Sequence, residues 1–413
     1  MALNPDFQAA LASIIRPIYA TDLPDNLEAM RHWLSGLGLA TPTYPFIAVA
    51  GSVGKGSTAL ALARHFAGIG QRIGLYTSPH LHSFRERFQI DGVMISQKAF
   101  AHHAGRIMAL TRNSGAQPST FETATLIAYN WFSAEGVDLA ICEIGMGGRF
   151  DAVNAAPNQL AIFTPIEREH VVALGGTLES IAWHKAGILQ NGGVGISLPQ
   201  SPVVEAVFER EAKSKNAKLI WAQDEAALIE HARSIISPKM RIEISPHVHQ
   251  WADQLPGRLE VVSFEERIYI IDGAHTSRGA ARLRAHLDTY NQQPILLAAA
   301  LLRDKPAPEI LSLFDDPLFT IFLTSLSGHR RANPEDIMRE WHPSHAKVEI
   351  VENIAEAFSR AAHSHQRLIA ICGSLRAAAL AREILGLVSD SALIESKFTR
   401  SLFESDSYLR EIR

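Results

Sequence analysis

A glycine-rich turn with one lysine and two hydroxyl residues is the first stretch of this sequence that could do chemistry. It reads Gly-Ser-Val-Gly-Lys-Gly-Ser-Thr over residues 51–58, between an apolar run at 46–50 and an Ala/Leu-rich run. Backbone N–H groups at a strand-to-helix turn bind phosphate oxygens, and the positive end of the helix adds to the attraction. Lys55 would supply a mobile positive charge, and Ser57 or Thr58 a hydroxyl for phosphate or Mg²⁺. The pattern predicts a phosphate site; a glycine turn with a solvated lysine is the alternative.

The stretch departs from the common phosphate-loop pattern G-x-x-x-x-G-K-[ST] at two positions. Val49 stands where the first glycine should be, and Gly56 replaces the hydroxyl residue that normally follows the lysine. From these residues alone, the turn is either a nucleotide site of another kind or a glycine-rich bend.

A glutamate at the end of a predicted strand is the second feature that could do chemistry. Glu143 ends the apolar run of residues 139–144 and opens a glycine-rich loop that carries Arg149 and Asp151. In an open α/β sheet the carboxyl ends of the strands face the ligand crevice. A carboxylate there is suited to Mg²⁺, which prefers oxygen ligands, although a lone glutamate at a strand end is more often a solvated residue.

The third feature is a histidine and a lysine over residues 164–189. His170 follows another predicted strand, and Lys185 lies in the mostly apolar stretch Ala-Trp-His-Lys-Ala-Gly-Ile. Burial of an unpaired ammonium group is costly, so lysines in apolar sequence often have altered chemistry. A lone histidine would more often be structural.

Short apolar runs that alternate with longer amphipathic stretches must position these residues. This alternation predicts an α/β fold with an open, mostly parallel sheet and helices on both faces. The predicted strands of this first part are residues 46–50, 72–76, 139–144 and 160–163. The rhythm restarts near Pro294, with predicted strands at residues 295–301, 319–323, 348–351 and 368–372. We therefore predict a larger domain over residues 1–293 and a smaller α/β domain over residues 294–413, with a mobile helix or appendage after Leu387.

The composition limits the class of protein. The 413 residues carry a net charge of −4, which argues against a general nucleic-acid or membrane-surface partner. No apolar run approaches the ~18 residues that a membrane span needs, and no signal peptide is evident. Cys142 and Cys372 each lie in an apolar run, so we expect two core residues and no disulfide. These features predict a cytoplasmic protein.

Six segments in one order resemble the Mur ligase superfamily, specifically its folylpolyglutamate synthase/dihydrofolate synthase branch. The resemblance extends from about Leu27 to Leu385 and is carried by GSVGKGST, YTSPHLHSFRERFQIDGVMIS, EIGMGGRFDAVN, GGTLESIAWHKAGI, PGRLEV and DGAHTSRGA. The phosphate loop of this branch reads much like residues 51–58, with Asn in place of Val53. The resemblance implies a nucleotide site with a shorter glycine spacing, in a P-loop-type central domain that is followed by a smaller Rossmann-like domain.

The resemblance also implies roles for individual residues. The implied ATP-phosphate ligands are Gly51, Gly54, Lys55, Gly56, Ser57 and Thr58. The implied Mg²⁺ ligands are Ser78, Glu143 and His170, to which we add the Ser57 hydroxyl of the glycine-rich turn. Lys185 matches a lysine that is carbamylated in the family and so can bind a second Mg²⁺. Lys55, Lys185 and His170 would then be the catalytic residues. Residues of the second half implied to reach the nucleotide are Arg258, Asp272 and His275. The positions implied to line the acid-substrate site are Phe121 and Glu122, and we add Arg149 and Asp151 of the glycine-rich loop.

The implied activity is that of an ATP-dependent carboxylate–amine ligase that adds L-glutamate to dihydropteroate, folate or both. Its reaction runs through an acyl phosphate, and we expect a monomer. Two alternatives stay open: a Mur-type ligase for a different acid or amino acid, and a non-catalytic nucleotide-binding descendant.

Several positions depart from the family pattern. Glu169 stands for Asp, His184 for Glu, and Thr276–Ser277 for Asn-Pro. No counterpart of the family's Gly-x-His-Gln-x-x-Asn-Ala helix is found between Gly195 and Val261. We expect the first sheet to be trimmed at one edge, and adenine recognition to differ from that of the family.

Overall fold

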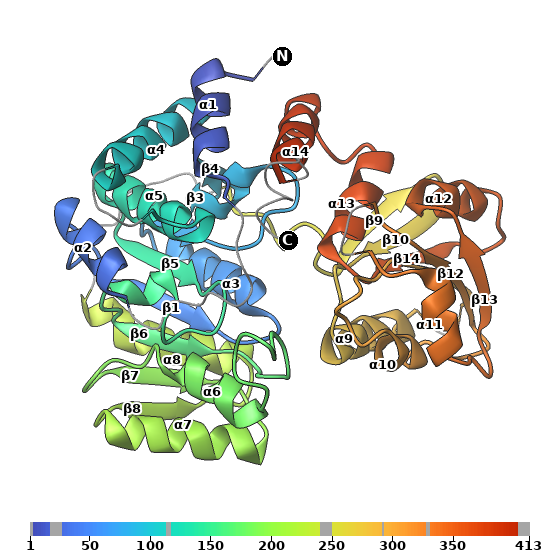
Figure 1. The fold of residues 1–413 in the computed structure, drawn as a ribbon. Helices are drawn as coiled ribbons and strands as arrows, with labels where there is room; N and C mark the ends of the chain where they lie inside the picture. Colours follow the sequence, from blue (N-terminus) through green and yellow to red (C-terminus); the bar gives the residue numbers. More distant parts are fainter. Residues whose placement is uncertain are drawn as a thin grey trace. The chain divides into compact units, whose positions relative to one another are not determined.

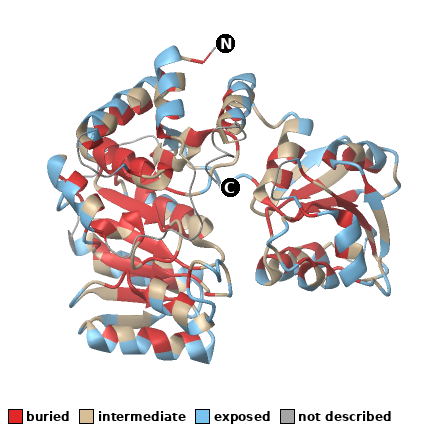
Figure 2. Cartoon of the chain, in the orientation of Figure 1, coloured by how far each residue is buried: buried red, intermediate tan, exposed pale blue. Residues whose placement is uncertain are grey.

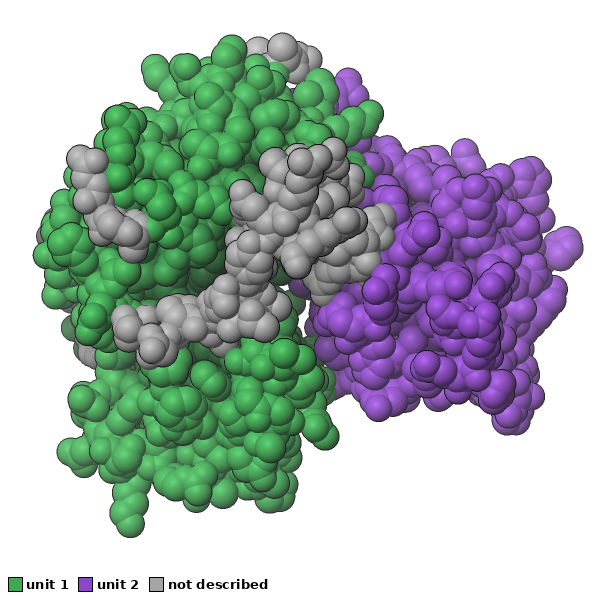
Figure 3. Space-filling model, in the orientation of Figure 1, with its two compact units in different colours: residues 1–253, 394–413 green, residues 254–393 purple. Residues whose placement is uncertain are grey.

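The computed structural model describes residues 3–16, 27–112, 117–239, 250–290, 293–327 and 331–403, which form two compact units (Figures 1 and 3). The first unit combines residues 1–253 with residues 394–413, and the second comprises residues 254–393. The chain therefore passes from the first unit to the second and then returns.

The first unit is built on an eight-stranded sheet with the order β4-β3-β2-β5-β1-β6-β7-β8. Strands β2, β5, β1, β6, β7 and β8 run parallel to one another. Strands β3 and β4 pair antiparallel at the edge beside β2. This confirms the predicted mostly parallel α/β fold. The strands are β1 (Phe46–Ala50), β2 (Ile73–Tyr76), β3 (Phe88–Ile90), β4 (Val93–Met94), β5 (Leu139–Glu143), β6 (Leu160–Phe163), β7 (Val194–Ser197) and β8 (Lys218–Trp221).

Helices cover this sheet and bury its central strands (Figure 2). Every residue of β1 and β5 is buried, as expected of parallel strands that are covered on both faces. The α-helices of this unit are α1 (Pro5–Ile14), α2 (Glu28–Gly36), α3 (Lys55–Gly68), α4 (Gln97–Thr111), α5 (Thr120–Glu135), α6 (Leu178–Ala186), α7 (Pro202–Ser214), α8 (Glu225–Ile236) and α14 (Asp390–Phe403). Short 3₁₀ turns are η1 (Phe84–Arg87), η2 (Ala152–Ala155) and η3 (Ser237–Lys239).

The second unit is a six-stranded sheet with the order β13-β12-β11-β14-β10-β9. It is parallel except for β9, which pairs antiparallel with β10. Its strands are β9 (Glu260–Phe264), β10 (Arg267–Ile271), β11 (Ile295–Ala299), β12 (Phe319–Thr324), β13 (Lys347–Val351) and β14 (Leu368–Cys372). Its helices are α9 (Ser277–Asp288), α10 (Ala307–Ser312), α11 (Pro334–Glu340), α12 (Ile354–Ala362) and α13 (Leu375–Ile384).

The predicted domain division near residue 293 lies too late in the chain. β10 pairs with β14 along four residues, so a cut at residue 293 would separate neighbouring strands of one sheet. The tail predicted after Leu387 also belongs elsewhere, because α14 from Ile394 onward is part of the first unit. Residues 404–413 lie outside the described residues.

Cys142 and Cys372 are buried and free, as the sequence predicted. Within the described ranges, every helix is too short or too polar to cross a bilayer.

Candidate functional site

The glycine-rich turn joins β1 to α3 in a shape that requires glycine at two positions. Gly51 has φ +154°, and a Cβ there would lie 1.8 Å from Thr164 Oγ1. Gly54 has φ +88° and precedes α3 directly. Lys55 is the first helical residue, and the first N–H groups of a helix have no acceptor within it. The turn therefore offers backbone donors and one lysine to an anion, as the phosphate-site prediction requires.

The segment after β6 braces this turn. Ser52 N and Val53 N donate to Pro165 O over 3.0 and 3.4 Å. Ser52 Oγ donates to Glu167 O and accepts from Glu167 N. These bonds fix the turn without a ligand, so a bound phosphate would meet a largely preformed loop.

Thr58 differs from the expectation that its hydroxyl serves phosphate or metal. Its side chain is buried, and Oγ1 donates to Glu225 Oε1 at the start of α8 over 2.8 Å. Glu225 was not predicted from the sequence, because nothing local pairs it with a residue 167 positions away.

Glu143 and Ser78 come together at the ends of neighbouring strands. Glu143 is the last residue of β5, and its Oε2 accepts from Ser78 N over 2.9 Å. Glu143 is paired in register with Val49 of β1, two residues before Gly51. The Glu143 carboxylate and the Ser78 hydroxyl are hard oxygen donors, a set that fits Mg²⁺ with several retained waters.

His170 lies in the segment between β6 and α6. It is exposed and has a left-handed backbone with φ +48°. Among the residues that the structure describes, no group of three His, Cys, Asp or Glu side chains is close enough to hold a metal. The structure thus joins Ser78 to Glu143, and the membership of His170 in the predicted ligand set stays a prediction.

Lys185 forms a buried ion pair beside the phosphate loop. Its Nζ lies 2.7 Å from Glu169 Oε1 and 2.7 Å from Gly51 O, and the residue is only 2% exposed. Burial lowers the pKa of Lys185, and the Glu169 carboxylate acts in the opposite direction. Burial would raise the pKa of Glu169, but the charges of Lys185 and Lys55 bring this pKa down to about 2. The ion pair therefore ties α6 to the first carbonyl of the loop.

This pair predicts a pH dependence of stability. The pKa of Glu169 falls from 4.5 to about 2 on folding, so its stabilising effect is complete above pH 4.5 and is lost as the pH falls through about 2. The free energy of unfolding of Glu169→Gln should therefore differ most from that of the parent above pH 4.5, and the difference should shrink in acid. Urea unfolding between pH 3 and pH 6 measures it, with exposed Glu179→Gln on α6 as the control. A constant difference across this range would contradict the pairing.

Arg149 and Asp151 hold the glycine-rich loop after β5. Arg149 Nη2 donates to Glu211 Oε2 over 2.6 Å, and the guanidinium lies 3.9 Å from the Trp183 ring centroid. The Asp151 carboxylate accepts from Met146 N and from Val153 N, each over 3.0 Å. Burial raises the pKa of Asp151 to about 7, which the backbone hydrogen bonds oppose. Both residues, predicted to line the substrate site, have structural partners here.

Arg149→Ala tests which role dominates. If the guanidinium chiefly joins the loop to α6 and α7, the variant should lose about 1–3 kcal/mol in free energy of unfolding. Exposed Arg210→Ala on α7 should change little. Unchanged stability with a raised KM for the acid substrate would instead support the substrate role.

Phe121 and Glu122 lie in the first turn of α5, and their side chains make different contacts. Glu122 closes a capping box, since its Oε2 accepts from Ser119 N over 2.7 Å. Phe121 faces the glycine-rich loop, because a Cβ at Gly145 would lie 2.5 Å from its ring. Phe121 is therefore beside the loop, whereas the Glu122 carboxylate is used as a helix cap.

Asp272 follows β10 in the second unit as a buried carboxylate. Its Oδ2 accepts from Leu259 N over 2.7 Å and from Arg282 Nη2 over 3.0 Å. Arg282 was not predicted from the sequence, although it lies ten residues after Asp272 on the following helix.

Arg258 and His275 lie near the same strand end. A Cβ on Gly273 would be 2.9 Å from Arg258 Nη1, and His275 Nδ1 is 2.7 Å from Gly273 O. Thr276, which replaces the family asparagine, accepts from Gly279 N and caps α9. The structure thus gathers the three residues predicted to reach the nucleotide at one end of β10.

The interval that lacks the family's Gly-x-His-Gln-x-x-Asn-Ala helix contains β7, α7, β8, α8 and η3. α8 packs against α3, the helix that begins at the phosphate loop. Residues 240–249 of this interval lie outside the described residues.

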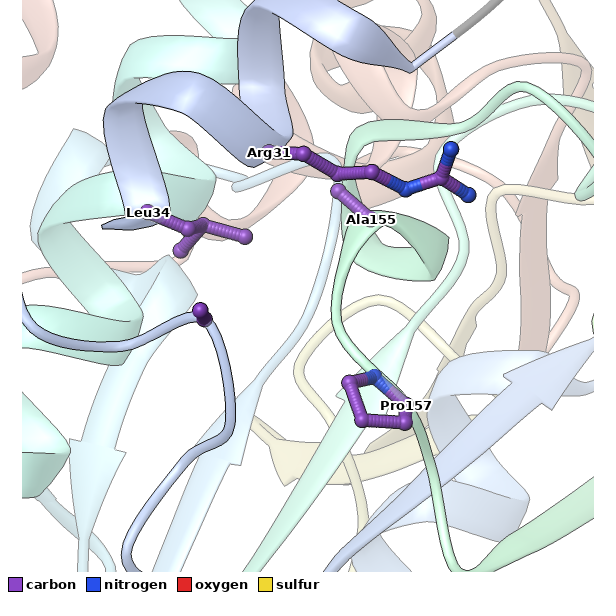
Figure 4. Close-up of a pocket in the computed structure, with 5 residues that line it drawn as sticks. Arg31, Leu34, Ala155 and Pro157 are labelled. Carbon is purple, nitrogen blue, oxygen red and sulfur yellow. The ribbon is translucent and has the colours of Figure 1, made fainter. Parts of the chain in front are cut away.

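A shallow hollow of about 250 Å³ opens between α2 and the segment around η2 (Figure 4). Arg31 and Leu34 come from α2 and face Ala155 and Pro157. No predicted site residue lines it, so we assign it no role in the reaction.

Comparisons with known proteins agree on one family. The family model for the Mur ligase glutamate ligase domain matches residues 257–375. Folylpolyglutamate synthase of Lacticaseibacillus casei is 27% identical over 85% of this chain and 92% of its own length. Dihydrofolate synthase/folylpolyglutamate synthase of Bacillus subtilis is 26% identical over 76% of this chain and 84% of its own length. Folylpolyglutamate synthase of Neurospora crassa is 31% identical over 61% of this chain. The matched part spans 56% of the length of that relative.

Solved structures give the same result. E. coli FolC in complex with ADP superposes with a TM-score of 0.80 and 25% identity, covering 92% of this chain and 97% of its own. Mycobacterium tuberculosis folylpolyglutamate synthase complexed with ADP and AMPPCP gives a TM-score of 0.75 and 25% identity, covering 87% and 95%.

Proposed function

The chain belongs to the Mur ligase superfamily, in its folylpolyglutamate synthase/dihydrofolate synthase branch, and from this premise we propose that it is an ATP-dependent ligase adding L-glutamate to dihydropteroate, folate or both. The observation that carries the proposal is the preformed phosphate loop with Lys55 at its helix start. The Glu143–Ser78 pair lies at a neighbouring strand end.

The proposed reaction has two steps. The carboxylate oxygen of the acid attacks the γ-phosphorus of ATP, which gives an acyl phosphate and releases ADP. The neutral amine of glutamate then attacks the acyl carbon, and inorganic phosphate leaves from the tetrahedral intermediate while the nitrogen loses a proton. Phosphoryl transfer of this kind asks the protein for positioning and for neutralisation of charge.

The residues of the first unit divide these tasks. The loop N–H groups hold the phosphates, and Lys55 places a positive charge beside the transferred group. Ser78, Glu143 and His170 would hold Mg²⁺, which supplies further positive charge to the phosphate oxygens when bound. We also propose that Lys185 is carbamylated in the active enzyme and carries the anionic group for a second Mg²⁺. Carbamylation would replace the ammonium group and so end the Lys185–Glu169 ion pair described above.

Arg258, Asp272 and His275 are assigned to the nucleotide, and Phe121 to the acid substrate. We further propose that the enzyme is a cytoplasmic monomer, a state that light scattering of the purified chain can test.

A phosphate-release assay tests the function. It contains ATP, Mg²⁺, dihydropteroate and glutamate, with each omitted in turn, and release should require all four. Release with a different acid or amine from a panel would keep the ligase and change its substrates. ATP binding without release under any combination would favour a non-catalytic descendant and would overturn the proposal.

A further inference from the structure

The C-terminal helix carries a buried carboxylate into the first unit. Glu395 on α14 is 0% exposed, and the neighbouring Ser396 and Thr399 are also buried. Phe398 and Leu402 pack against the apolar core of the same unit. A helix that only covered apolar surface would not bury a carboxylate, so Glu395 must meet specific partners.

Those partners lie between β2 and β3. Ser83 Oγ donates to Glu395 Oε1, and Arg85 donates to Glu395 Oε2 through Nε over 3.1 Å and through Nη2 over 2.9 Å. The Arg85 side chain is 16% exposed. Two charge-assisted hydrogen bonds that are largely shielded from water fix the position of the Arg85 side chain. Removal of the Glu395 carboxylate would leave the Arg85 guanidinium without its anion in a poorly solvated place.

Both partners belong to residues 77–87, which we call the Ser78 segment. Thr77 N donates to Arg87 O and joins the two ends of the segment. The Glu86 carboxylate accepts from Leu81 N, His82 N and Ser83 N at 2.7–2.9 Å. The segment is thus internally rigid, and its side-chain links to other elements include Glu143 through Ser78 N and Glu395 through Ser83 and Arg85.

We propose that Glu395 is a positioning residue for the metal site: by fixing Ser83 and Arg85 it holds the Ser78 segment so that Ser78 stays beside Glu143. The inference rests on the proposed function for the metal itself. It makes the C-terminal helix part of the ATP unit, although the second unit, residues 254–393, separates it from the rest of that unit in sequence.

The test compares Glu395→Gln with Lys397→Gln in the full chain. The first substitution keeps the side-chain shape but removes the charge, whereas Lys397 is exposed on the same helix. Amide hydrogen exchange of residues 78–87 should become faster in Glu395→Gln, while that of residues 51–58 should not change. The Mn²⁺ concentration that half-saturates the enzyme in the presence of a non-hydrolysable ATP analogue should rise about tenfold, as for other residues that support a metal ligand. Lys397→Gln should match the parent in both measurements.

A second variant covers the case in which Glu395→Gln does not fold. Ser83→Ala removes one hydroxyl link and should shift exchange and Mn²⁺ binding in the same direction by a smaller factor. Exchange and Mn²⁺ binding equal to those of the parent in the folded variants would overturn the inference. A parent that binds Mn²⁺ with the analogue but releases no acid-dependent phosphate would overturn the proposed function alone.

Discussion

Lys55→Ala should lower the rate of amide formation by about a thousandfold, the cost of removing one preorganised charge from a developing transition state. Lys55 begins α3 directly after Gly54, so its ammonium group is carried by the same backbone that offers N–H groups to the phosphates. The positive charge of Lys55 also acts on a neighbouring side chain, because it contributes to the lowered pKa of Glu169. Alanine favours the helix, so the fold should persist.

The measurement is single-turnover formation of the amide with saturating ATP and acid, together with thermal unfolding of the same variant. Lys213→Ala removes an exposed lysine from α7 and serves as the control for a change of charge. The prediction fails if Lys55→Ala turns over within a few-fold of the parent. A large loss of thermal stability would show that the lysine acts through the fold.

The two sheets could be predicted because most of their strands are short apolar runs. Such a run can be identified from its own residues, without knowing which strand it pairs with. β1, β5 and β14 are buried over every residue, and a strand covered on both faces is apolar throughout. The β9–β10 hairpin gave no such signal. Both strands are partly exposed, and their turn places Glu265 and Glu266 at positive φ without the Asn-Gly or Asp-Gly pair that usually marks such turns. For this reason the domain division was predicted too late in the chain.

The candidate site could be predicted where its chemistry is local in sequence. The phosphate loop and the end of β5 each lie within a few consecutive residues, so residue type and spacing sufficed. The partners Thr58–Glu225 and Ser83–Glu395 are 167 and 312 positions apart, and only the topology of the sheet and the return of the chain bring them together. Arg149 illustrates a different limit. An arginine suits both a substrate carboxylate and the Trp183 ring, and its residue type does not distinguish the two.

Lys185→Ala should have two effects that can be separated. It leaves the Glu169 carboxylate, 12% exposed, without its cation, and breaking a buried pair in this way costs about 3–5 kcal/mol of stability. In the carbamylated form of the enzyme, it also removes the proposed anionic ligand of the second Mg²⁺, so amide formation should be lost. The double variant Lys185→Ala/Glu169→Gln removes the stranded charge and should recover much of the stability while staying inactive.

Short carboxylic acids decide whether the lost activity belongs to a carbamate. Truncation at Lys185 leaves room beside Gly51 that acetate or formate can enter, and an anion there would replace the carbamate group. We therefore expect these acids to restore part of the activity of Lys185→Ala while leaving the parent unchanged. The parent should also show a ¹³C carbamate resonance with ¹³CO₂ that Lys185→Ala lacks. Stability loss without any loss of activity would make Lys185 a purely structural residue that holds Gly51 and Glu169. Loss of activity without rescue or resonance would mean that its ammonium group is the form that acts.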